Sequence, residues 1–97
     1  MTRLDPVHPG EILKHDFMEP FGLSSNALAK AIGVTPARVN EIVRTRRGIS
    51  AETALRLAKY FGTDAQSWMN LQDQFELAQA QRKAGKAIAE IEPLRVA

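Results

Sequence analysis

The sequence predicts an all-α fold of five helices. Apolar residues recur at three- and four-residue spacing through most of the chain, which is the helical period, and only the C-terminal end alternates in part. Glycine and proline fall between these periodic segments, where helices are expected to end. With 97 residues, the chain is long enough for one small domain.

The first helix is expected to begin at Pro9, because proline suits the first turn, and to end near Glu19, before Pro20 and Gly22. Its apolar side carries Ile12, Leu13 and Phe17. Ser24 or Ser25 is expected to cap a short second helix that ends at Gly33. The buried positions of this second helix are expected to be Leu28, Ala29 and Ile32.

Thr35 followed by Pro36 predicts the start of a third helix, because a capping hydroxyl precedes a first-turn proline. This helix is expected to end near Arg44. Ser50 is expected to cap a fourth helix, which Gly62 ends. The buried positions are expected to be Val39, Ile42 and Val43 in the third helix and Ala54, Leu55, Ala58 and Phe61 in the fourth.

The fifth helix is expected to start after Thr63 or Asp64 and to end at Arg82 or Lys83. Trp68, Leu71, Phe75 and Ala78 form its apolar stripe. Beyond Gly85 the pattern changes, and this tail is open to three conformations: an edge strand, a frayed helix or a disordered segment. We therefore divide the chain into a domain at residues 1–84 and a tail at residues 85–97.

Residues 25–44 fit a helix-turn-helix motif. Two short helices that cross steeply need a small residue where they meet, and Ala29 supplies it. Gly33 can take the positive φ that the tight turn requires, and Val34 is expected to fill the turn. The contact between the helices is expected to join Leu28 and Ile32 to Val39 and Ile42.

If these apolar positions are buried, the other side of the third helix must face outward. Its polar and small side chains belong to types that can read base edges in the major groove of DNA. The candidate base-reading residues are Thr35, Ala37, Arg38, Asn40, Glu41 and Arg44. The candidate phosphate-binding residues, on the preceding helix and the following loop, are Ser25, Asn26, Lys30, Arg46 and Arg47.

The distribution of charge supports this interpretation. The whole chain has 13 basic and 11 acidic residues, a formal net charge of only +2. Residues 30–47 hold five basic side chains and one acidic side chain, which is a local charge of +4, whereas residues 49–97 are balanced. The positive charge is thus concentrated around the expected DNA-reading helix.

Other functions find no support in the sequence. The absence of cysteine excludes thiol catalysis, disulfides and thiolate metal sites, and no apolar run is long enough to cross a membrane, so a cytoplasmic location without membrane contact is expected. The two histidines, His8 and His15, have no third ligand at a usable spacing, so no metal is expected.

An enzyme is not expected either, and no cofactor is predicted. The carboxylate pairs Asp16 with Glu19 and Glu90 with Glu92 are expected on solvated surfaces, where nothing would raise a pKa for acid–base catalysis. The serines are already explained as helix caps.

The fifth helix carries apolar residues on more than one side, which predicts that a second copy of the chain covers part of it. The residues expected at this dimer interface are Trp68, Met69 and Leu77.

Several motifs resemble one family. The run His-Pro-Gly-Glu-Ile-Leu from His8 resembles the opening of the HigA-type (VapI-like) antitoxins, a branch of the phage-repressor-like (XRE) helix-turn-helix proteins. Residues 32–42 and 49–58 are similar to the recognition segment and the fourth helix of that family. Trp68 with Leu71-Gln72 and Phe75-Glu76-Leu77 resembles its fifth helix. The likeness covers about residues 7–78 and implies a five-helix phage-repressor-like domain.

The resemblance implies a role with two parts. Such antitoxins bind a palindromic operator in their own promoter as dimers, and they hold a RelE-like messenger-RNA endonuclease toxin in an inactive complex. Two alternatives stay open: a stand-alone repressor without a toxin partner, and a protein-interaction module that has lost DNA binding.

Overall fold

The N-terminal part of the fold is one helical segment in three geometries. The computed structural model describes residues 6–95, and in it α1 (Pro9–Ile12) continues as a π-helix, η1 (Leu13–Met18), and then as a 3₁₀ turn, η2 (Glu19–Phe21). The Nδ1 atom of His8 caps α1 by accepting a hydrogen bond of 2.8 Å from the Gly10 amide. Gly22, at φ 65°, ends the segment, so the helical conformation extends to Phe21 rather than Glu19.

The next two helices form the predicted helix-turn-helix. Helix α2 (Ser25–Ile32) is capped by Ser24, whose Oγ accepts from the Ala27 amide at 3.0 Å. Gly33 takes a φ of 75° in the turn, as the sequence predicts. Helix α3 (Pro36–Val43) begins after Thr35, whose Oγ1 accepts from the Arg38 amide at 3.2 Å.

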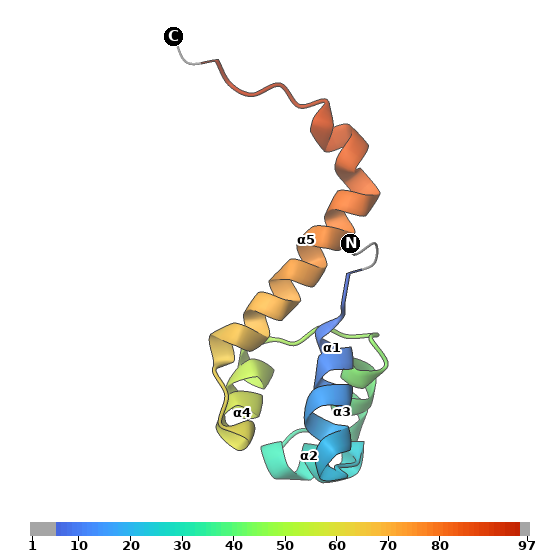
Figure 1. Cartoon of the computed structure of the whole chain (residues 1–97), viewed down its shortest axis with the longest axis vertical. Helices are drawn as coiled ribbons and strands as arrows, with labels where there is room; N and C mark the ends of the chain where they lie inside the picture. The colour runs from blue at the N-terminus through green and yellow to red at the C-terminus, as the bar shows by residue number, and fades with distance from the viewer. Residues whose placement is uncertain (1–5, 96–97) are drawn as a thin grey trace.

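Helices α4 (Ala51–Phe61) and α5 (Ala65–Ala89) complete the fold. Ser50 caps α4, Gly62 ends it at φ 70°, and Asp64 rather than Thr63 caps α5. Figure 1 shows the first four helices gathered at one end of the molecule, with α5 rising from α4 and extending beyond them. The all-α, five-helix prediction is confirmed.

The core lies between these helices and confirms most of the expected apolar positions. Leu28, Ala29 and Ile32 of α2 are buried together with Val39 and Ile42 of α3. Among residues 6–95, the buried hydrophobic residues are Leu13, Met18, Leu28, Ala29, Ile32, Val39, Ile42, Ile49, Ala54, Leu57 and Trp68.

The prediction for the buried side of α4 was wrong at one position. Leu55 is 64% exposed, and the fully buried leucine is Leu57. Thr53 and Ala54 are also buried, so the inward side of the helix follows Ala54 and Leu57, three residues apart. Because apolar residues occupy neighbouring positions of α4, the sequence alone allows either Leu55 or Leu57 to face inward. Only packing against the neighbouring helices fixes the rotation of α4 about its axis.

The predicted end of α5 at Arg82 or Lys83 was also wrong, because the helix continues through Gly85 to Ala89. Alanines surround Gly85 in this stretch, and alanine has the highest helix propensity, which offsets the cost of one glycine. Residues 91–95 have no regular secondary structure, and no strand forms in the described part of the tail. Across residues 6–95, no helix is both long and apolar enough to span a membrane.

Candidate nucleic-acid interface

The outward side of α3 follows from its two buried residues. Val39 and Ile42 are each 1% exposed and fix the helix against α1 and α2. None of the six candidate base-reading residues is buried: Thr35, Ala37 and Arg44 are exposed, and Arg38, Asn40 and Glu41 are half-buried. The helix therefore presents a continuous row of polar and small side chains to solvent.

The candidate phosphate-binding residues belong to the helix before α3 and to the loop after it. Ser25 is half-buried at the start of α2, and the other four are exposed: Asn26, Lys30, Arg46 and Arg47. Arg46 and Arg47 belong to the loop after α3, so basic side chains follow the C-terminal end of the helix. This placement suits contacts to the DNA backbone beside a helix that reads bases.

The loop that carries these arginines has a defined backbone. Thr45 takes a φ of 62°, which non-glycine residues rarely adopt, and its Oγ1 donates to the Arg44 carbonyl at 2.6 Å. The carbonyl of Glu41 accepts from the amides of both Arg46 and Arg47, at 2.8 and 3.2 Å. These bonds satisfy the free carbonyl end of α3 and hold the arginines close to it.

An ion pair connects one candidate base reader to one candidate phosphate binder. The Oε1 atom of Glu41 lies 3.1 Å from Nε of Arg47, and both side chains are about half exposed, at 47% and 48%. This pair was not predicted from the sequence, because the two residues are six apart and the helix ends between them. Helical spacing identifies only partners three or four residues apart.

Residues of α1 and α5 pack closely against α3 and the loop that follows it. Gly10 lies so close to α3 that a Cβ there would overlap the carbonyl oxygen of Ile42. The buried side chain of Gln72 accepts from the Ile49 amide at 2.7 Å and donates to Glu76 at 2.7 Å. Gln72 also fills the space beside Gly48, where a Cβ would meet its amide group at 2.6 Å.

His8 joins the same support. Its ring is buried, lies edge-on to Phe75 with centroids 4.7 Å apart, and hydrogen-bonds to the backbone of Arg47. Burial lowers the pKa of His8 below its usual 6.5, against the opposing effects of the Glu11 charge and the bond to Arg47. A neutral ring matches its contacts, because Nδ1 needs a free lone pair to cap α1.

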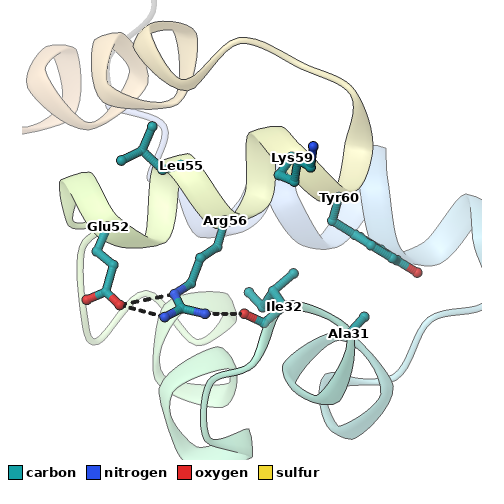
Figure 2. Close-up of a pocket in the computed structure, with 7 residues that line it drawn as sticks. All are labelled: Ala31, Ile32, Glu52, Leu55, Arg56, Lys59 and Tyr60. Carbon is teal, nitrogen blue, oxygen red and sulfur yellow. Dashed lines mark hydrogen bonds and ion pairs between the residues drawn. The ribbon is translucent and has the colours of Figure 1, made fainter.

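A second network holds the turn of the motif. Arg56 of α4 donates to the Ile32 carbonyl at 2.7 Å and to Oε2 of Glu52 at 2.8 and 3.1 Å (Figure 2). The hydrogen bond and charge of Arg56 lower the pKa of the Glu52 carboxyl, and the charge of Arg38 adds to this effect. Arg56 thus satisfies the carbonyl of Ile32, the last residue of α2, and holds the turn that orients α3.

The three residues expected at a dimer interface differ in their exposure to solvent. Trp68 is only 2% exposed, its ring is tilted by 53° against that of Phe17 with centroids 5.0 Å apart, and its Nε1 donates to Oγ1 of Thr63 at 2.9 Å. Trp68 belongs to the core of the single chain, which leaves little of its side chain open to a partner, so its place in the interface stays a prediction. Met69 is half-buried and Leu77 is 71% exposed, which keeps both available.

Comparison with known proteins identifies the family. Residues 15–68 match the family described as Helix-turn-helix. Virulence-associated protein I of Dichelobacter nodosus is 58% identical over 81 residues, which make up 84% of this chain and 75% of that protein. The structure of the Pseudomonas aeruginosa antitoxin HigA with the higBA promoter matches with a TM-score of 0.90 and 54% identity, over 93% of this chain and 99% of that chain.

The chain belongs to the HigA branch of the helix-turn-helix family. A further Pseudomonas aeruginosa structure, a complex with 18-bp operator DNA, matches with a TM-score of 0.91 and 52% identity. The match covers 97% of this chain and 100% of the protein chain in that complex. Relatives in this branch carry the names of antitoxins and HTH-type transcriptional regulators. Within residues 6–95, no three histidine or carboxylate side chains gather where they would hold a metal ion.

Proposed function

We propose that this chain is an antitoxin that binds operator DNA as a dimer, represses its own operon and neutralises a RelE-like messenger-RNA endonuclease by direct binding. One observation carries the DNA-binding part: α3 presents a polar row to solvent, and a rigidly held basic loop follows it. Relatives solved with a promoter or an operator support the same conclusion.

In the proposed complex, the six candidate residues of α3 read base edges in the major groove. The five candidate residues Ser25, Asn26, Lys30, Arg46 and Arg47 contact phosphates. A two-fold symmetric dimer places two copies of α3 in successive major grooves, about 34 Å apart. The operator is then palindromic, with half-sites separated by about one helical turn.

Substitution of single residues tests these roles. Asn40→Ala is expected to weaken operator binding by about 1–3 kcal/mol and to relax the sequence preference, because a base contact is lost. Arg46→Ala is expected to weaken binding to all DNA to a similar degree, because phosphates carry no sequence information. Equal losses on operator and scrambled duplexes for Asn40→Ala would reject its role as a base reader.

The far half of α5 is the proposed dimer contact. Leu77 is 71% exposed and Ile88 is 46% exposed, and their separation of eleven residues, about three turns, places them on one side of the helix. Light scattering at micromolar concentration should give the mass of two chains, and Leu77→Glu should reduce it to the mass of one. A monomeric wild-type chain would remove α5 as the dimer contact.

The toxin-binding part requires a partner from the neighbouring reading frame. We place the toxin contact on the first helical segment or on the tail, because both lie outside the candidate DNA-contacting residues. Co-expression of the adjacent frame should yield a complex and restore growth that the adjacent product alone arrests. If the adjacent product neither binds nor is toxic, the chain is a stand-alone repressor.

A further inference from the structure

The ion pair between Glu41 and Arg47 lies inside the candidate interface and occupies two groups that DNA would also use. A glutamate carboxylate on a recognition helix can accept a hydrogen bond from the amino group of cytosine. An arginine in the following loop can neutralise a phosphate. In the free chain each group satisfies the other, at 3.1 Å.

We propose that Glu41 is a specificity-determining residue that couples base reading to phosphate binding. It holds Arg47 in the free chain and on non-cognate DNA, and it releases Arg47 when a cytosine amino group takes the place of the guanidinium. This inference rests on the proposed function, because it applies to the same DNA-binding surface.

The ion pair between Glu41 and Arg47 is weak enough to open on the operator and favourable enough to persist on other DNA. Both side chains are about half exposed, and an ion pair in contact with water is weak enough to open when other partners are offered. On a site without the matching cytosine, release of Arg47 would leave the Glu41 carboxylate unpaired against the negative charge of DNA. Arg47 therefore stays with Glu41 on such a site and contributes no phosphate contact.

The backbone restricts the exchange to side chains. The Glu41 carbonyl holds the amides of Arg46 and Arg47, and the backbone of Arg47 also bonds to the buried ring of His8. Arg47 can therefore reach a phosphate by turning its side chain, without movement of the loop.

Arg46 is the matched control that the chain offers. Arg46 lies in the same loop, its amide donates to the same Glu41 carbonyl, and its side chain is exposed. Among the described residues, no carboxylate pairs with it. Arg46 is expected to contact phosphate on any sequence, whereas Arg47 is expected to do so only on the operator.

The experiment compares two duplexes of equal length and composition: an operator selected by the wild-type chain from a random library, and its scrambled form. Dissociation constants are measured over a range of salt concentrations. Glu41→Gln should bind the scrambled duplex about three- to tenfold more tightly. The slope of log Kd against log salt should steepen by about 0.9, as one added phosphate contact requires. The gain should vanish when Arg47→Gln is also present.

The arginine variants provide an arm that does not depend on how Glu41→Gln folds. Arg47→Gln should weaken operator binding by about tenfold and scrambled binding by less than about twofold, whereas Arg46→Gln should weaken both alike. Thermal melting of each variant checks that the fold is retained.

Three results would overturn the inference: Glu41→Gln leaves the scrambled duplex unaffected, its gain persists beside Arg47→Gln, or Arg47→Gln weakens scrambled binding as much as Arg46→Gln. A persistent gain would show a general effect of removing one negative charge. If the wild-type chain selects no duplex at all, the proposed function itself fails, which is distinguishable from these outcomes.

Discussion

Residues 8–75, the packed region, and residues 77–95, the projecting region, differ in what surrounds their side chains. In the packed region, helices are capped by named side chains, and bonds such as that from Ile49 to Gln72 join distant segments. In the projecting region, large apolar side chains stand in solvent, with Leu77, Ile91 and Leu94 between 68% and 89% exposed. The extension of α5 away from the other helices is evident in Figure 1.

Different interactions therefore stabilise the packed region and the projecting region. The packed region is held by burial of apolar surface and by contacts between distant residues. The helix of the projecting region is held by its own backbone bonds and by residues of high helix propensity, so its exposed apolar side chains contribute little to folding of the single chain. In the proposed dimer, contact with a second chain would cover part of these side chains.

Leucine-to-alanine substitutions in the two regions should differ most in their effect on the free energy of unfolding. Leu28→Ala in the packed region is expected to reduce the free energy of unfolding by about 2–5 kcal/mol, because Leu28 is fully buried. Leu77→Ala in the projecting region should change it by less than about 0.5 kcal/mol. Urea unfolding at a dilution where the chain is monomeric measures both. A comparable loss for Leu77→Ala would mean that the projecting region packs more closely than described.

Glycine substitutions should give effects of opposite sign. Gly10→Ala is expected to cost about 2–3 kcal/mol, because the new Cβ overlaps the Ile42 carbonyl and neither backbone can yield. Gly85→Ala is expected to stabilise the helix by about 0.5–1 kcal/mol, since the new Cβ meets only the movable end of Gln81. Thermal melting reports the first effect, and helical circular dichroism reports the second. A destabilising Gly85→Ala would indicate that the glycine serves a close contact.

The pH dependence of stability should belong to the packed region. The pKa of His8 is lower in the folded chain than the usual 6.5, so below about pH 6.5 the unfolded chain binds the proton more readily. The stabilisation is present above this pH and is lost as the pH falls through the folded pKa. His8→Asn keeps a capping side chain without titration and should remove this component of the pH profile. An unchanged profile would assign the dependence to other groups.

Local features of the fold were predictable from the sequence. The caps at Thr35 and Ser50 and the left-handed turn at Gly33 depend on residue type and immediate neighbours. The contact between α2 and α3 follows from apolar spacing alone. The error at Leu55 arose because two adjacent apolar stripes fit α4, and only packing chooses between them.

The sequence by itself determined the number and order of the helices, the helix-turn-helix and the concentration of positive charge around the recognition helix, because these depend on spacing and composition along the chain. Only the tertiary structure decided which groups pair across it. Arg56 reaches the Ile32 carbonyl, Gln72 reaches the Ile49 amide, and Glu41 holds Arg47. The first two pairs join residues 24 and 23 apart, and the third crosses a helix end. Such pairs form only where folding brings donor and acceptor within hydrogen-bond distance, which no local spacing rule specifies.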